Sequence, residues 1–206
     1  FFSNIMSNVN FIGLSLSLPS VDIVTKFFHD DPEIFDFVKK IIIACDTGVK
    51  DIEIVEQEDE QEKITKYIPV FIHEVDGKDR GIPYHTESSG TKSLYIQLAK
   101  YKLILNSGGI LCLDEFDINF HPHILPILLQ LFTDPEKNTT NAQIIFTTHN
   151  SDVLDYLGRY RSYLVDKENN ESFSYRLDEI PGDILRNDRP ILPIYNLGKI
   201  GGVPKL

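Results

Sequence analysis

Two short apolar segments constrain the fold of this chain more than any other feature. "ILCL" at 110–113 and the start of "AQIIFTTHN" at 142–150 are both rich in aliphatic or aromatic residues, as buried strands are. Between them lies "HILPILLQLFTD" at 123–134, which has the length and periodicity of an apolar helix. Two apolar strands joined by a helical crossover form a βαβ unit with parallel, buried strands. The pattern predicts an α/β fold with a parallel sheet core and flanking helices.

Polar side chains follow both predicted strands. Asp114 and Glu115 come directly after the first strand, while His149 and Asn150 end the second. In parallel sheets, ligands gather at the carboxyl ends of the strands. Because both strands point the same way, we expect these acids and the histidine at one edge of the sheet.

These residue types suit nucleotide hydrolysis. Mg²⁺ prefers one or two carboxylate oxygens and otherwise keeps water and phosphate oxygens, so Asp114 is the candidate metal ligand. Glu115 could orient or deprotonate an attacking water, and His149 could hydrogen-bond a terminal phosphate. Each of these residues, considered alone, also has a purely structural interpretation. Buried strands often end in polar residues, and a histidine after a strand is often an ordinary loop residue.

The rest of the chain divides into recognisable elements. Asp31 and Pro32 are typical of a helix start, and apolar residues recur at helical spacing after them. The other predicted elements are two half-buried strands at 51–57 and 67–75 around the solvated acidic loop "EDEQEK", a helix at 92–105, a short helix at 151–157 and two strands within 162–177. We therefore expect a single partial domain, 1–206, with four zones: 1–50 mainly helical, 51–86 a strand pair with an acidic loop, 87–177 the core, and 178–206 a tail.

Composition limits the function classes. The chain has 206 residues, enough for one α/β domain, and no apolar run approaches the ~20 residues of a membrane span. Its net charge of −11 disfavours direct nucleic-acid binding, since no basic patch stands out in the sequence. Cys45 and Cys112 lie in apolar surroundings without metal or redox spacing, which suits reduced thiols in a cytoplasm. No secretory leader opens the chain, so we expect a cytoplasmic protein.

Three motifs carry a family resemblance. "ESSGTKSLYIQLAKY" at 87–101, "GGILCLDEFDINFHPHILPILLQLF" at 108–132 and "QIIFTTHNSDVLD" at 143–155 resemble the signature motif, Walker B with D-loop, and histidine switch of ABC-type ATPases. They are most similar to the AAA15 group of bacterial ATPases, which includes abortive-infection and other anti-phage defence proteins. A weaker resemblance extends upstream through "ACDTGVKDIEIVEQ" and to the ending "GKIGGVPKL".

The resemblance implies ATP and Mg²⁺ as cofactors, a homodimer that sandwiches ATP, and a possible effector protein. It places His121 in the D-loop at the dimer interface, and it gives Asp114, Glu115 and His149 the roles proposed above. The signature residues would contact the γ-phosphate of ATP held by the opposite subunit: Ser88, Ser89, Gly90 and Thr91. Hydroxyls and backbone N–H groups at a helix start favour phosphate, and glycine permits close approach. The same stretch is also an ordinary helix N-cap in composition.

The sequence departs from the family pattern in one respect. It has no Walker A motif, because in "GTKS" Thr91 separates Gly90 from Lys92. We therefore expect the C-terminal portion of a longer ATPase, truncated before Phe1 and inactive alone. Two alternatives remain: a non-hydrolysing dimerisation module, and a metal-dependent nuclease built on Asp114, Glu115 and Asp117. A zinc site at the pair of His121 and His123 lacks ligands to complete it.

Overall fold

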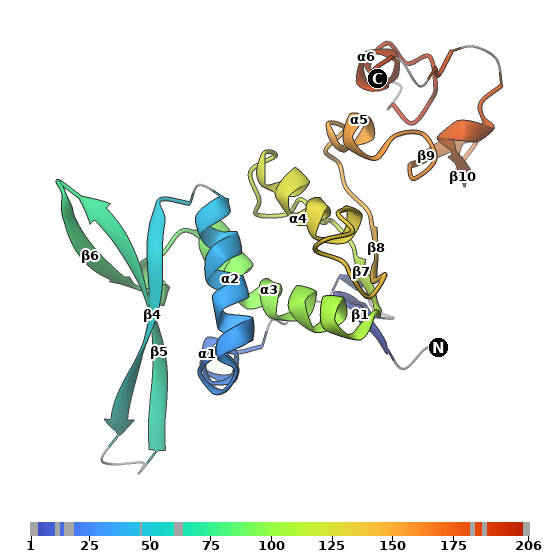
Figure 1. Ribbon diagram of the computed structural model, residues 1–206. Helices are drawn as coiled ribbons and strands as arrows, with labels where there is room; N and C mark the ends of the chain where they lie inside the picture. Colours follow the sequence, from blue (N-terminus) through green and yellow to red (C-terminus); the bar gives the residue numbers. More distant parts are fainter. Residues whose placement is uncertain are drawn as a thin grey trace. The chain divides into compact units, whose positions relative to one another are not determined.

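The computed structural model describes residues 4–10, 13–14, 19–45, 47–59, 64–181, 184–186 and 189–203. The chain divides into two compact units, Phe1–Thr148 and His149–Leu206, which are described here one at a time (Figure 1). Residues 60–63 of the predicted acidic loop lie outside the described residues. The division into four zones stays a prediction.

The first unit contains the expected parallel sheet. Strand β7 (Ile110–Leu113) pairs in parallel with β8 (Gln143–Phe146) on one side and β1 (Ile5–Ser7) on the other. Helix α4 (Ile124–Thr133) forms the crossover between β7 and β8. This confirms the predicted α/β class. Strand β1 was not predicted.

Three further helices accompany the sheet: α1 (Val21–Asp30), α2 (Pro32–Ala44) and α3 (Ser89–Ser107). As predicted, Asp31 caps α2: its carboxylate accepts a hydrogen bond from the Ile34 N–H at 3.1 Å. Helix α3 contacts α1 and α2 as well as β1 and β7, so it is the central helix of the unit (Figure 1). It ends at Gly108, whose φ of +67° is left-handed backbone that favours glycine.

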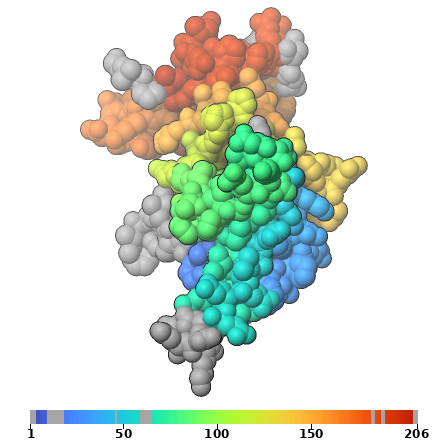
Figure 2. Space-filling model, turned by 90° about the vertical axis from the view of Figure 1, so that its left-hand side faces the viewer, coloured from blue at the N-terminus to red at the C-terminus, as the bar shows by residue number. Residues whose placement is uncertain are grey.

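An antiparallel sheet forms the other part of the first unit. Its strands are β4 (Val49–Asp59), β5 (Ile64–Val75) and β6 (Lys78–Pro83), paired in that order. In Figure 2 this sheet, cyan to green, faces the viewer. The two longer strands were predicted and β6 was not. The sheet joins α3 through buried aromatic rings, since Phe71 of β5 lies 5.4 Å, centroid to centroid, from Tyr95 of α3. Phe28 of α1 packs 5.0 Å from the same ring.

Short elements complete the described chain. The first unit also has β2 (Val9–Asn10), β3 (Gly13–Leu14) and a 3-10 turn at Tyr84–Thr86. The second unit comprises α5 (Val153–Leu157), β9 (Tyr163–Glu168), β10 (Glu171–Arg176), a 3-10 turn at Leu177–Glu179, and α6 (Leu192–Asn196). Strands β9 and β10 are the two strands predicted within 162–177, and they pair antiparallel. Among the described residues, no helix has the length and apolar character needed to cross a membrane.

Candidate functional site

Asp114 follows β7 directly, and its backbone is held on both sides by one side chain. The Asp114 N–H donates to Asn8 Oδ1 at 2.7 Å, and Asn8 Nδ2 donates to the Asp114 carbonyl oxygen at 2.8 Å. Asn8 itself follows β1, the neighbouring strand. The paired amide contacts therefore fix where the carboxylate leaves the sheet.

Glu115 has an unusual backbone. Its φ of +50° lies in the left-handed region, which non-glycine residues seldom occupy. Such conformations persist where the surrounding contacts enforce them, and they cluster at functional sites. Here the contacts come from the next strand, because the Glu115 N–H donates to Thr147 Oγ1 at 3.0 Å and the Phe116 N–H to the Thr147 carbonyl oxygen at 2.9 Å.

Two threonines after β8 hold the acids and were missed by the sequence analysis. Thr147 Oγ1 donates a hydrogen bond to Asp114 Oδ1, and Thr148 Oγ1 donates to Asp117 Oδ1 at 2.6 Å. The signal available in the sequence was the pair "TT" between the second apolar strand and His149. The threonines show that the ends of β7 and β8 meet, as the parallel arrangement predicts.

The signature residues begin α3. Ser88 is the N-cap: its hydroxyl accepts from the Thr91 N–H at 3.1 Å and lies 2.8 Å from the Thr91 hydroxyl. Ser88 and Ser89 are exposed, whereas Thr91 is buried. The structure therefore shows Ser88 as a helix cap. Contact with a phosphate stays a prediction for Ser88, Ser89, Gly90 and Thr91.

Gly90 brings the signature against the loop that follows the acids. A Cβ atom at this position would lie 3.0 Å from the carbonyl oxygen of Asn119, closer than side chains normally pack. Glycine therefore permits the approach of two segments 29 residues apart in sequence. The first unit thus places the predicted signature beside the loop after β7.

A part-buried acid–histidine pair anchors the start of the signature. Glu87 Oε1 lies 2.5 Å from His73 Nε2 on β5, and the side chains are 6% and 17% exposed. The other oxygen, Glu87 Oε2, accepts from the Ser88 N–H at 3.1 Å. The antiparallel sheet is therefore connected through Glu87 to the first residue of the predicted signature. Neither residue was singled out in the sequence.

A small cavity of about 50 Å³ lies beside Glu115. Lys100 and Tyr101 of α3 also line it, and burial lowers the pKa of Lys100 from its ordinary value and raises that of Tyr101. The Tyr101 hydroxyl is buried without a hydrogen-bond partner among the described residues. A cavity of this size has room for a water molecule, which could satisfy that hydroxyl.

Both predicted histidines have exposed side chains. His149 is exposed and is the first residue of the second unit, so its role toward a phosphate stays a prediction. His121 is exposed, and its Nδ1 accepts from the His123 N–H at 3.4 Å. The described part of the chain has no group of three or more histidines, cysteines and acids able to hold a metal.

The donor set at Asp114 nevertheless fits Mg²⁺. Its carboxylate is partly exposed, and Thr147 occupies only Oδ1, so Oδ2 is the hard oxygen ligand that this ion prefers. Magnesium usually takes one or two carboxylates and completes its shell with water and phosphate. A cluster of three acids is not required.

Comparison with known proteins decides the family. The family described as "AAA domain, putative AbiEii toxin, Type IV TA system" matches residues 3–155. The chain belongs to this family. An uncharacterized protein of Dictyostelium discoideum is 34% identical over 93 residues, which make up 41% of this chain and 12% of that protein. The chain therefore matches only a small part of that relative's length.

Two solved structures superpose on most of this chain. A structure concerned with ATP-driven dimerization and DNA stimulated activation of SMC ATPases superposes with a TM-score of 0.50 at 15% identity, covering 74% of this chain and 88% of that one. An SmcHead bound to the C-winged helix domain of ScpA gives a TM-score of 0.48 at 13% identity, covering 77% and 49%. At 15% identity, the first likeness is one of fold alone.

Proposed function

We propose that this chain is the C-terminal portion of an ABC-type ATPase of the AAA15 kind, which binds and hydrolyses ATP with Mg²⁺ between two head domains. The observation that carries the proposal is the placement of Asp114 and Glu115 after β7, beside the loop that Gly90 approaches. Family membership supports the ATPase chemistry.

The chain's own residues would divide the work. Asp114 would hold Mg²⁺, which when bound neutralises phosphate charge. Glu115 would orient a water molecule and accept its proton, while Thr147 and Asn8 fix the backbone of both acids. Ser88, Ser89, Gly90 and Thr91 would present N–H and hydroxyl groups to a phosphate across the dimer, with His121 in the same interface. His149 would hydrogen-bond that phosphate.

Glu115→Gln in the full-length protein tests this assignment. A glutamine keeps the size of the side chain but cannot accept the proton, so turnover should fall about 100-fold or more while ATP binding persists. ATP turnover and ATP-dependent dimerisation by light scattering are the measurements. Glu136→Gln, at an exposed turn after α4, is the matched control. Unchanged turnover in Glu115→Gln would reject Glu115 as the base.

The biological context proposed here is anti-phage defence, with ATP-driven closure of the dimer acting on an effector. The support is the resemblance of the three motifs to abortive-infection ATPases and the family description. Phage plating on cells that carry the wild-type or the Glu115→Gln protein tests it. Equal plaque numbers with the wild-type gene and with no gene would remove the defence role and leave the ATPase assignment standing.

A further inference from the structure

Glu87, the residue before Ser88 of the predicted signature, is held at three of its atoms. Its Oε1 lies 2.5 Å from His73 Nε2 of β5, and its Oε2 accepts from the Ser88 N–H at 3.1 Å. Its own N–H donates to the Tyr84 carbonyl oxygen at 3.1 Å. The side chain is only 6% exposed, which is rare for an acid. The fold therefore keeps this carboxylate beside the start of α3.

These contacts determine which backbone donors at the start of α3 remain free. The Ser88 N–H is taken by Glu87, and the Thr91 N–H is taken by the Ser88 hydroxyl. The N–H groups of Ser89 and Gly90 have no acceptor among the described residues, as is usual in the first turn of a helix. Free N–H groups at a helix start favour phosphate. Glu87 therefore orients Ser88, which the two free donors directly follow.

A lone carboxylate at this position would repel the phosphate that those donors attract. His73 offsets the charge, because a protonated imidazole beside Glu87 leaves the pair without net charge. Among the described residues, the ion pairs give Glu87 one cationic partner, His73. Arg80, the cross-strand neighbour of His73 on β6, is exposed, and Lys92 Nζ donates instead to the His85 carbonyl oxygen at 3.5 Å. Removal of His73 therefore leaves an uncompensated negative charge next to the signature.

We propose that His73 and Glu87 are positioning residues for the γ-phosphate of ATP, a role that rests on the proposed function. Glu87 orients the start of the signature, and His73 cancels the charge that this carboxylate brings there. Both act through Ser88 and the N–H groups that follow it, so neither side chain is catalytic. The affinity for ATP then depends on the contact between β5 of the antiparallel sheet and the start of α3.

Steady-state ATP turnover of the full-length protein at pH 6, where histidine side chains commonly carry a proton, tests the pair. His73→Gln keeps an N–H donor for Glu87 and removes the positive charge. We expect the KM for ATP to rise about fivefold or more with kcat nearly unchanged, because the substrate and the transition state are repelled alike. Glu87→Gln and the double variant H73Q/E87Q carry no carboxylate there, so both should keep KM within about twofold of the wild type.

The double variant separates charge from structure. A pair that only stabilised the fold would leave H73Q/E87Q at least as impaired as His73→Gln, whereas removal of both charges restores ATP binding. Impairment of the double variant would therefore overturn the proposal. So would a His73→Gln protein with the wild-type KM.

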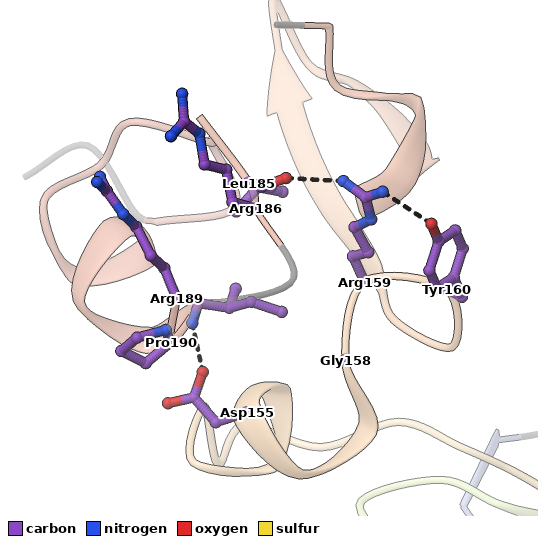
Figure 3. Close-up of a pocket in the computed structure, with 9 residues that line it drawn as sticks. Asp155, Gly158, Arg159, Tyr160, Leu185, Arg186, Arg189 and Pro190 are labelled. Atoms are coloured by element: carbon purple, nitrogen blue, oxygen red, sulfur yellow. Dashed lines mark hydrogen bonds between the residues drawn. The ribbon is translucent and has the colours of Figure 1, made fainter. Parts of the chain in front are cut away.

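Two control variants change similar contacts elsewhere. His29→Gln is the matched control, since His29 lies 3.0 Å from Glu56 in an exposed acid–histidine pair between α1 and β4. Tyr160→Phe controls for the loss of a hydrogen bond, because the Tyr160 hydroxyl accepts from Arg159 Nη2 at 2.7 Å in the second unit (Figure 3). Both controls should keep the wild-type KM.

A measurement on the wild-type 206-residue chain guards against misfolding of the variants. The nitrogen chemical shifts of the His73 ring in NMR spectra at pH 6 report its protonation, and we expect a proton on both ring nitrogens. A neutral ring would overturn the proposal. Failure of the proposed function is a separate result. If the wild-type full-length protein does not hydrolyse ATP, both proposals fail, whereas turnover with an unchanged KM in His73→Gln removes only the role of the pair.

Discussion

Single hydroxyl and amide groups hold the candidate acids in position. Thr147 contacts both, donating to Asp114 and accepting from the Glu115 N–H. Thr147→Val removes the hydroxyl at nearly constant volume and leaves a carboxylate without its donor. Hydrogen bonds to charged groups contribute about 1.5–3 kcal/mol, so urea unfolding should show a loss toward the lower end of that range at this partly exposed site. Thr147→Ser keeps the hydroxyl and should retain most of the stability; equal losses in both variants would contradict this role.

Cys45 gives the fold a pH dependence in the alkaline range. Burial at the end of α2 raises the pKa of its thiol to about 11 from an ordinary value of 9.0, because the fold disfavours the thiolate. The protonated thiol therefore contributes full stability below pH 9, and the contribution is lost as pH rises toward 11. Between pH 9 and 10 we expect a loss of about 1 kcal/mol.

Urea unfolding at pH 8, 9 and 10 under reducing conditions measures this loss. Cys45→Val is the control, since valine keeps an apolar group there and cannot ionise. Tyr95 and Tyr101, whose pKa values burial also raises, act in the same direction but are present in both proteins. Parallel pH profiles for the two proteins would show that Cys45 does not carry the effect.

At the scale of elements, the sequence predicted those with strong local signals. Strands β7 and β8 are apolar runs bounded by polar or glycine-rich sequence, and α2 has both a cap and a proline at its start, so their positions followed from local physics. Strand β1 was missed because it has only three residues and pairs with a segment about 105 positions away. Strand β6 was missed because "KDRGIP" is polar and exposed along most of its length.

The residues of the candidate site likewise include some that the sequence predicted and some that it did not. The placement of Asp114 and Glu115 after β7 could be predicted, because polar residues that follow a buried strand can be recognised from the sequence alone. Asn8 and Thr147 could not, since their hydrogen bonds to the acids span 106 and 32 or 33 residues. Periodicity and capping rules describe local sequence and do not report such contacts.

Helix α3 and the loop after β7 meet through Gly90. Gly90→Ala places a methyl group 3.0 Å from the Asn119 carbonyl oxygen, so one of the two backbones must shift. We expect a stability loss of about 1 kcal/mol, within the cost of overpacking and net of alanine's better helix propensity. In the full-length protein, ATP turnover should fall with it. Ser89→Ala, the exposed neighbour on the same helix, should change stability by less than about 0.5 kcal/mol; equal stability of the two variants would mean that the loop moves freely.

On the scale of the whole molecule, the two units differ in charge as well as in fold. Residues 149–206 carry eight lysines and arginines against nine acids, a net charge of −1, whereas residues 1–148 carry twelve against twenty-two, a net charge of −10. The second unit also has its own apolar core, made of Leu154, Leu164, Leu177, Leu185, Ile191 and Ile200. A core of this size supports only marginal stability, because small units bury a smaller fraction of their surface.

Leu177→Ala tests whether that core is energetically separate. Leu177 is fully buried, so truncation should cost about 2–5 kcal/mol, enough to unfold a marginal unit. NMR spectra of the variant should then lose the dispersed amide signals of residues 149–206 and keep those of β7, β8 and α3. Leu197→Ala removes the same atoms from a side chain that is 69% exposed and should leave both sets intact. If Leu177→Ala instead unfolds the entire chain in one transition, the two units form a single cooperative structure.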